Sequence, residues 1–248
     1  MGAPIGRRTL LKLAGSWPGL LKPEVFMVER LRLELDLTRL PDSDYALGNI
    51  DREEIEFLVD HCPETGTFAD IGSNLGIYSL FVARRKPKAT VLAIEPVPGI
   101  VAKLRRNIAL NNAGNVFVGE YALADEETTK ELMLNTTTNS GGNSFVVSQA
   151  PFQGFESAIA VKTKTLYQAL VENGIAQLDA LKADVEGYEY PILRKFFTDA
   201  PKSFWPRAMV IEEFGPTIAR AGGSAVELAI SSGYRLLNHN NMNFFFAL

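Results

Sequence analysis

Hydrophobic positions along this chain follow two periods, which alternate through most of its length. Residues 30–38 carry leucine at every second position, which predicts a half-buried strand. Short apolar runs predict further buried strands at residues 68–71, 90–94, 116–123, 178–185 and 208–211. Residues 235–238 and 243–248 predict a closing pair of strands. Apolar residues at helical spacing predict helices over residues 51–59, 75–85, 97–110, 164–174, 189–197 and 224–232.

Strands that alternate with helices predict an α/β fold, with a mostly parallel sheet and helices on both faces. Ligands of such sheets bind beyond the carboxyl ends of the strands. Acidic residues are frequent at the positions expected there. These positions are Asp70, Glu95, Tyr121 with Ala122, residues 184–189 and Glu212.

A glycine-punctuated turn at residues 72–76 joins the predicted strand at 68–71 to the helix after it. Its two glycines allow a sharp reversal and a close approach by a ligand or strand, and Ser73 or Asn74 can cap the helix. A dinucleotide fingerprint would need glycine where Asn74 and Ile77 stand, and a phosphate-binding loop sequence is absent. The turn therefore suits a nucleoside, with an ordinary strand-to-helix turn as the alternative.

Glu95 follows the second of the buried strands. A carboxylate at this place can accept both hydroxyls of a ribose that lies over the glycine turn. The alternative is a solvated acid or a helix cap beside Pro96. Because the glycine turn and this acid occur together, we favour the ribose role.

A second group of acids lies at residues 184–189, directly after a buried strand. Glu189 suits a helix start, where a negative charge favours the helix dipole. Asp184 and Glu186 lie earlier, on the turn itself, where they could steer a cation, accept a proton or ligate a metal. Among the histidines, His61 precedes the first core strand and is expected to be structural, and His239 is a reserve candidate base.

Composition narrows the class of protein. The net charge of −4 argues against a nucleic-acid surface, which needs excess Lys and Arg. The single cysteine, Cys62, excludes an internal disulfide framework and suits a reducing compartment, so we expect a cytoplasmic protein. No apolar run approaches the roughly 20 residues that span a bilayer, so we expect no transmembrane segment.

The N-terminus resembles a twin-arginine export signal at residues 6–12. The apolar stretch that follows is short, is broken by Pro18 and lacks a small-residue cleavage site. We therefore expect a basic amphipathic segment that packs on the domain or covers its pocket. The predicted helix over residues 51–59 begins with a predicted capping box at residues 51–54.

Three segments together resemble one known family. They read FADIGSNLGIYSL (residues 68–80), VLAIEPVPGIVAKLRRNIALNN (91–112) and LKADVEGYEYPIL (181–193), and they resemble the FkbM family of S-adenosylmethionine (SAM)-dependent methyltransferases. The resemblance extends from about residue 51 to residue 212 and is absent from the first forty residues and the C-terminal tail. It divides the chain into an N-terminal appendage, residues 1–50, and a methyltransferase domain, residues 51–248.

The resemblance implies a class I, Rossmann-like sheet of seven strands, the last of them antiparallel. It implies an enzyme that uses SAM and methylates a hydroxyl of a sugar, glycolipid or natural-product-type metabolite. Its acceptor would be a small molecule or a glycan, and the sequence leaves room for a homo-oligomer. The implied SAM contacts are Asp70, Gly72, Asn74 and Gly76, with Glu95 at the ribose and Tyr121 and Ala122 at the adenine. The catalytic candidates are Glu186, Asp184 and, in reserve, His239.

Other functions stay open on the sequence alone. A SAM-binding module without turnover conflicts with the intact acidic turn at residues 184–186. A nucleic-acid methyltransferase would often carry an Asn/Asp-Pro-Pro-aromatic tetrapeptide there, and an NAD oxidoreductase would carry the missing glycine pattern. The polar loop at residues 135–144 could order over an acceptor or form a solvated hairpin tip. We assign no metal site, although the sequence leaves open whether a metal joins Asp184, Glu186 and Glu212.

Overall fold

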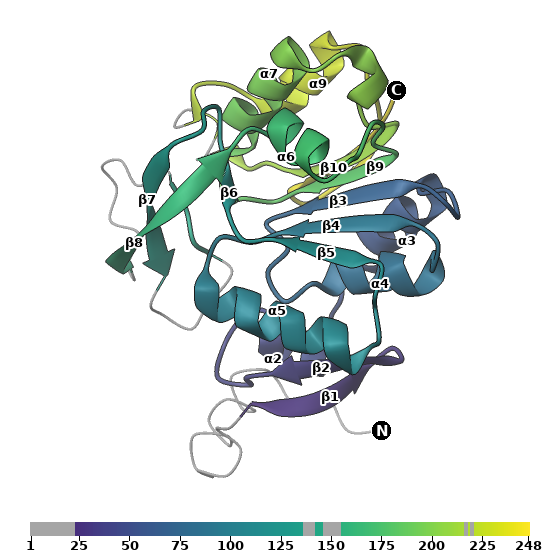
Figure 1. The fold of residues 1–248 in the computed structure, drawn as a ribbon, viewed down its shortest axis with the longest axis vertical. Coiled ribbons are helices and arrows are strands. Elements are labelled where there is room, and N and C mark those ends of the chain that lie inside the picture. Colours follow the sequence, from purple (N-terminus) through teal and green to yellow (C-terminus); the bar gives the residue numbers. More distant parts are fainter. Residues whose placement is uncertain (1–22, 136–141, 146–154, 216–217, 219–220) are drawn as a thin grey trace.

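The computed structural model of the protein describes residues 23–135, 142–145, 155–215, 218 and 221–248 (Figure 1). Its centre is a seven-stranded sheet in the order β11–β12–β10–β9–β3–β4–β5. The five strands from β10 to β5 run parallel, and β12 is antiparallel to both of its neighbours. The α/β class and the seven-stranded, mostly parallel sheet are therefore confirmed. The strands are β3 (Thr67–Ile71), β4 (Thr90–Ile94), β5 (Val116–Gly119), β9 (Ala180–Ala183), β10 (Ala208–Glu212), β11 (Arg235–Asn240) and β12 (Asn243–Ala247).

Helices cover both faces of this sheet (Figure 1). One face carries α3 (Arg52–His61), α4 (Ile77–Arg85) and α5 (Pro98–Leu110), and the other carries α6 (Leu166–Glu172), α7 (Glu189–Asp199) and α9 (Ala225–Ser231). Successive strand residues point to opposite faces, so Phe68 packs in one core and Ala69 in the other. Because both faces are buried, the central strands need apolar residues throughout, which is the continuous pattern that the sequence carries.

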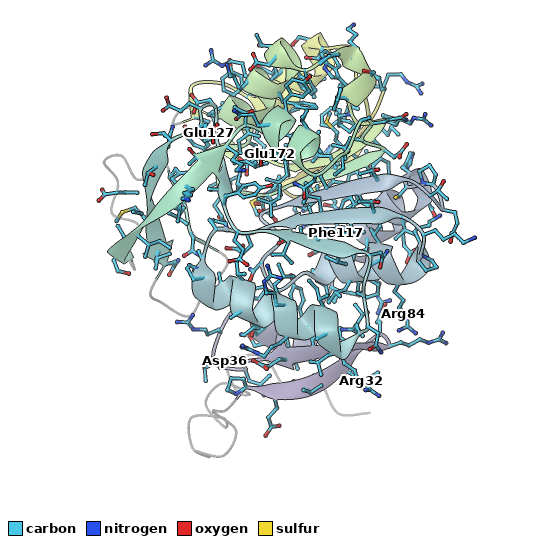
Figure 2. The ribbon with its side chains drawn as sticks, viewed as in Figure 1. Arg32, Asp36, Arg84, Phe117, Glu127 and Glu172 are labelled. Atoms are coloured by element: carbon cyan, nitrogen blue, oxygen red, sulfur yellow. The ribbon has the colours of Figure 1, made fainter. Side chains whose placement is uncertain are left out.

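The hairpin of β1 (Glu24–Val28) and β2 (Leu31–Leu35), with the short helix α2 (Asp42–Ala46), packs on the α5 side of the sheet. The inward leucines of β2 share one core with α3, α4 and α5. The Asn107 side chain accepts from the Glu34 amide at 2.7 Å and donates to the Leu75 carbonyl at 3.1 Å. Arg84 of α4 donates to the Arg30 carbonyl at 2.9 Å and so lies beside the hairpin that carries Arg32 (Figure 2). The described part of residues 1–50 is therefore built into the domain core, and the predicted basic segment, residues 1–22, lies outside the described residues.

Two predicted helix caps are wrong. The Asp51 side chain makes no cap at α3, because its carboxylate instead accepts a hydrogen bond from the Tyr78 hydroxyl at 2.9 Å. Neither Ser73 nor Asn74 caps α4, whose N-cap is Gly76 in the left-handed conformation (φ 84°). Asp51, Ser73 and Asn74 instead border a cavity at the carboxyl end of the sheet.

The predicted strand over residues 116–123 is also wrong in extent. β5 ends at Gly119, and the chain then leaves the central sheet. Residues Ala122–Leu123 form β6, which pairs with β8 (Phe155–Lys164), and β8 pairs in turn with β7 (Thr129–Asn135). We call β7 and β8, with residues 142–145, the β7–β8 arm; it stands beside the carboxyl ends of the central strands (Figure 1). Among the described residues, no helix has the length and apolar character that a bilayer crossing requires.

Candidate functional site

A cavity of about 250 Å³ opens at the carboxyl ends of β3, β4 and β9. Both predicted ligand segments contribute to its wall: the turn after β3 and the acidic turn after β9. Further parts of the wall come from the end of β4, from β6, from the N-terminal part, from α4 and from the β7–β8 arm. The lining residues include Gly72, Ser73, Asn74, Glu95, Ala122, Asp184, Glu186, Tyr45, Asp51, Tyr78, Leu132, Asn143 and Phe145.

The turn after β3 is tied to the end of β4. The amides of Gly72 and Ser73 both donate to the Ile94 carbonyl, at 3.1 and 3.0 Å. The hydroxyl of Ser73 and the side-chain oxygen of Asn74 are buried, and neither has a hydrogen-bond partner among the residues that the structure describes. Since buried polar groups are normally paired, these two atoms in the cavity wall fit a polar ligand.

Glu95 lies beside this turn, 5% exposed. Its carboxylate accepts from the Asn74 amide at 3.1 Å and from the Val97 amide at 3.0 Å. Burial raises the pKa of Glu95 to about 7, although both amide bonds oppose the rise. Each carboxylate oxygen can accept more than one hydrogen bond, so Glu95 can still receive ligand hydroxyls.

Three of the predicted cofactor residues do not line the cavity: Asp70, Gly76 and Tyr121. The buried Asp70 carboxylate accepts from the Ser79 amide at 3.0 Å and from its hydroxyl at 2.6 Å, so it ties β3 to α4. A methyl group on Gly76 would lie 2.4 Å from a Leu104 methyl carbon, so this glycine allows α5 to approach. Tyr121 packs against the core beneath α6 and α7.

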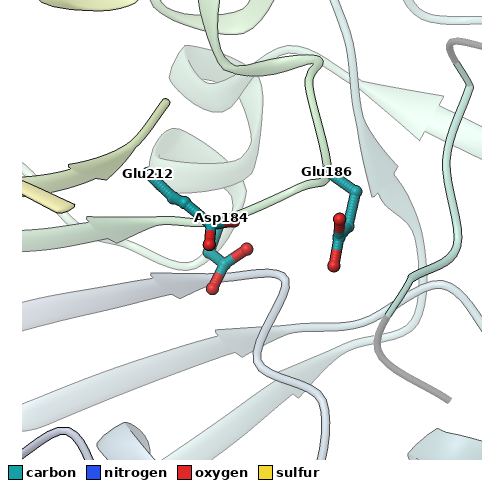
Figure 3. Close-up of side chains that lie close together, drawn as sticks. All are labelled: Asp184, Glu186 and Glu212. Atoms are coloured by element: carbon teal, nitrogen blue, oxygen red, sulfur yellow. The ribbon is translucent and has the colours of Figure 1, made fainter. Parts of the chain in front are cut away.

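Asp184, Glu186 and Glu212 form an acidic cluster in which one carboxylate oxygen from each residue lies within 4.8 Å of the other two. Figure 3 shows Asp184 next to Glu212, at the ends of neighbouring strands, with Glu186 farther along the turn. Asp184 and Glu186 line the cavity and Glu212 does not. Three carboxylates at this spacing are a donor set that a divalent cation can use. A protein cation already lies against them, however.

That cation is Lys182, which is 1% exposed. Its ammonium lies 3.1 Å from an Asp184 oxygen and 3.3 Å from the side-chain oxygen of Asn243. Burial alone would lower the pKa of Lys182, but the charge of Asp184 beside it raises the pKa overall. Burial likewise acts to raise the pKa of Asp184, but Lys182 and a hydrogen bond from Glu212 lower it overall. Burial and the Asp184 charge raise the pKa of Glu212, so Asp184 is the ionised member of this pair.

Glu186 is an acid of the cavity wall with a raised pKa. It lines the cavity, and its backbone is left-handed, with φ 56°. Burial, followed by the charges of Asp184 and Glu189, raises its pKa to about 8. A carboxylate in a cleft with a pKa close to neutrality suits general-base chemistry.

The structure does not bring His239 to the cavity. Because β12 is antiparallel to both β10 and β11, β11 runs parallel to β10, and His239 lies near the same edge of the sheet as Glu212. Its side chain is exposed, however, and stacks on Phe244 with ring centroids 5.8 Å apart. His61 lies at the end of α3 and bonds to the Phe57 carbonyl through Nδ1.

Sequence reasoning missed two sides of the cavity wall. Tyr45 and Tyr78 are buried residues that line the cavity, and the sequence gave no sign of this. Asp51 had a sequence signal, a carboxylate before a helix, but it was assigned to a cap. Asn143 and Phe145 come from the β7–β8 arm, of which the sequence indicated only the polar loop at residues 135–144.

Comparison with known proteins finds a matching family model, related sequences and similar solved structures. A sequence model of the methyltransferase FkbM domain matches residues 70–229. A protein named methyltransferase sdnD, from Sordaria araneosa, is 30% identical in an alignment that covers 71% of this chain and 80% of that protein. A 31-O-demethyl-FK506 methyltransferase FkbM from Streptomyces tacrolimicus is 27% identical in an alignment that covers 68% of this chain and 72% of that protein. The solved O-methyltransferase from Bacillus cereus, in complex with SAH, is similar with a TM-score of 0.49 and 12% identity over 80% of each chain.

Proposed function

The chain belongs to the FkbM family of SAM-dependent methyltransferases, and we propose that it methylates a hydroxyl group of a sugar, glycolipid or natural-product-type metabolite. The observation that carries the proposal is the meeting of three features in one cavity. The turn at residues 72–74, the Glu95 carboxylate and the Glu186 carboxylate all border the same space. The first two suit a nucleoside, and the third suits a proton transfer.

In this proposal SAM occupies the cavity with its ribose against Glu95, its methionine part over residues 72–74 and its adenine near Ala122. The unpartnered oxygens of Ser73 and Asn74 support this fit, because each lacks a hydrogen bond that a bound ligand would supply. Bound SAM supplies an activated methyl group on a positively charged sulfonium. Four acids line the cavity, and no Lys, Arg or His does so among the described residues, which suits a cationic cofactor. Direct contacts from Asp70, Gly76 and Tyr121 are not part of the proposal.

Glu186 would accept the proton of the acceptor hydroxyl. A hydroxyl is a poor nucleophile until its proton begins to leave, and a positioned base contributes typically ~100- to 10,000-fold to the rate. Asp184 would keep its negative charge beside Lys182, and this charge favours the positive methyl donor. The rest of the catalysis would be alignment of the two reactants.

The acceptor would be neutral or positively charged at the reacting end. A phosphate at the reacting end would be repelled by the carboxylates of Asp51, Asp184 and Glu186. Among the described residues, no cationic side chain lines the cavity to offset that repulsion. Leu132 and Phe145 of the β7–β8 arm add apolar wall, as a carbon-rich metabolite needs. The relative from Streptomyces tacrolimicus is named for an O-demethyl compound, which supports oxygen as the acceptor atom.

The proposed function is tested by supplying SAM with methyl glucoside, a hydroxylated macrolactone, and the amino analogue of each. We expect conversion of SAM to S-adenosylhomocysteine with at least one hydroxyl compound and an O-methyl product by mass spectrometry and NMR. Turnover with the amino analogues alone would contradict oxygen as the acceptor atom.

Replacing Glu95 by alanine should weaken SAM binding by about 1–3 kcal/mol, the usual cost of losing hydrogen bonds to a charged group. Calorimetric titration with SAM measures the change, and circular dichroism checks that the fold is kept. The matched control is Glu120→Ala, because Glu120 follows the neighbouring strand β5 but pairs with Arg105 at the exposed surface. The control should bind SAM normally. Unchanged affinity in Glu95→Ala would remove Glu95 from the ribose site.

A further inference from the structure

The backbone at Glu186 is in a conformation that side chains disfavour. Its φ is 56°, and that of the following Gly187 is 101°. A left-handed conformation strains a residue that has a side chain, whereas glycine adopts it freely. Such a conformation persists only where surrounding groups determine it. The turn therefore needs contacts that hold Glu186 in place.

Glu189 supplies the first of these contacts. Its side chain is 4% exposed, and its Oε1 accepts from the Val185 amide at 2.7 Å and from the Gly187 amide at 3.3 Å. These are the amides immediately before and after Glu186. Glu189 is the first residue of α7, as the sequence predicted, but its carboxylate binds the preceding turn. It does not line the cavity and so lies apart from any reactant.

Ser144 supplies the second contact, from the opposite side of the turn. Its hydroxyl donates to the Glu186 carbonyl at 2.8 Å. The Ser144 backbone is itself paired with Met133 of β7 through two hydrogen bonds of 3.1 Å. The turn is thus fixed to the β7–β8 arm, whose residues Asn143 and Phe145 line the cavity.

We propose that Glu189 is a positioning residue that, with Ser144, holds the Glu186 backbone left-handed so that the Glu186 carboxylate faces the cavity. The proposal rests on the proposed function, in which Glu186 accepts the proton of the acceptor. Without the Glu189 oxygen, the flanking amides lose their acceptor and the turn can relax toward a right-handed conformation. That change redirects the Cα–Cβ bond of Glu186 and moves its carboxylate from the productive position.

The test compares Glu189→Ala with Glu189→Gln in the full-length protein. The substrates are SAM and whichever hydroxyl compound, methyl glucoside or the macrolactone, the wild type methylates. Glutamine keeps an acceptor oxygen at the same reach, so its kcat should stay within about threefold of the wild type. Alanine removes it, so kcat should fall about 10- to 100-fold with little change in the KM for SAM, as misplacements of about 1 Å do. If Glu189→Ala does not fold, Glu189→Asp carries the same expectation, because it withdraws the oxygen by one methylene.

Glu213 provides a matched control. Its carboxylate also accepts amide hydrogen bonds at a helix start, from Ala225 and Val226 of α9, but it lies outside the cavity. Glu213→Ala should lower the urea midpoint and leave kcat unchanged. If Glu189 only stabilised the start of its helix, Glu189→Ala would behave in the same way, and the positioning role would be overturned.

A double variant separates failure of this inference from failure of the proposed function. In a Glu186→Gln background, Glu189→Ala should lower kcat no further, because residues that act as one unit are not additive. A further loss of the same size would overturn the inference, since Glu189 would then act without Glu186. Full activity of Glu186→Gln alone would instead refute the proposed role of Glu186. A low kcat for Glu186→Gln with a normal kcat for Glu189→Ala would overturn the positioning role alone.

Discussion

Replacing Glu186 by glutamine should lower kcat about 100- to 10,000-fold, while the dissociation constant for SAM changes little. Glutamine has nearly the same size as glutamate, so the cavity keeps its shape and loses only the base. The acceptor hydroxyl then keeps its proton through the transition state. Steady-state kinetics with the hydroxyl compound that the wild type methylates give kcat, and calorimetry gives the SAM affinity. Unaltered turnover in this variant would refute Glu186 as the base.

The pH dependence of kcat provides a second reading of the same variant. Only the ionised carboxylate accepts a proton, and the pKa of Glu186 is raised to about 8 in the free protein by burial and by Asp184. Activity should therefore be lost as the pH falls through the pKa of Glu186 and should level off above it. A bound sulfonium would move this pKa downward. Glu186→Gln should lose this step in its residual rate.

Two alternatives to Glu186 as the base predict different results: His239 as the base, and a divalent ion held by the acidic cluster. His239 is exposed and lies outside the cavity, so His239→Ala should keep nearly full activity. If His239 were the base, its alanine variant would show the collapse and Glu186→Gln would not. If the acidic cluster held a divalent ion, a chelator would abolish wild-type turnover and added magnesium would restore it.

Replacing Gly72 by alanine should lower the free energy of unfolding by roughly 2–5 kcal/mol, the sum of a left-handed backbone cost of about 1–2 kcal/mol and an overpacking cost of about 1–3 kcal/mol. Gly72 has φ 78°, and a methyl group on it would lie 1.8 Å from the Asp184 carbonyl oxygen. The obstructing atom belongs to the backbone, so no side-chain rotation relieves the clash. Urea denaturation measures the loss.

The chain offers a close control for this variant. Gly48 has φ 76°, and a methyl group there would meet nothing within 4 Å. Gly48→Ala should therefore show only the conformational cost, about 1–2 kcal/mol. Equal losses in the two variants would contradict the close approach of the Asp184 carbonyl to Gly72, because the added methyl group would then meet no obstruction there.

The contact at Gly72 also changes what this glycine means. The sequence suggested that the turn leaves room for a ligand, and Gly72 does line the cavity. The closer neighbour is the acidic turn, because the Asp184 amide donates to the Ile71 carbonyl at 3.1 Å and its own carbonyl lies against Gly72. The proposed SAM turn and the proposed catalytic turn are thus packed backbone to backbone, so each fixes the position of the other.

The central sheet was predictable because its strands are buried on both faces. Continuous apolar runs such as residues 90–94 leave little choice of structure, and β4 has these bounds in the structure. The position of Glu95 beside the glycine turn follows from the same rule, since adjacent parallel strands end at one edge. The acidic turn after β9 was predictable for the same reason.

The β7–β8 arm and the contacts of Asp51 were not predictable in this way. β7 reads TKELMLN, in which polar and apolar residues do not settle on one face, and its partner β8 begins about twenty residues later. Asp51 stands before a helix, where a cap is the local expectation, but Tyr78 from α4 competes for its carboxylate. The Ser144 contact to Glu186 joins residues 42 positions apart, which no local pattern encodes.

A crystal structure of the protein with S-adenosylhomocysteine tests the central claim most directly. We predict that the ribose hydroxyls contact Glu95, that the homocysteine part lies over residues 72–74, and that the sulfur faces the side of the cavity bordered by Glu186. A nucleoside bound outside this cavity, or a sulfur turned away from Glu186, would contradict the account.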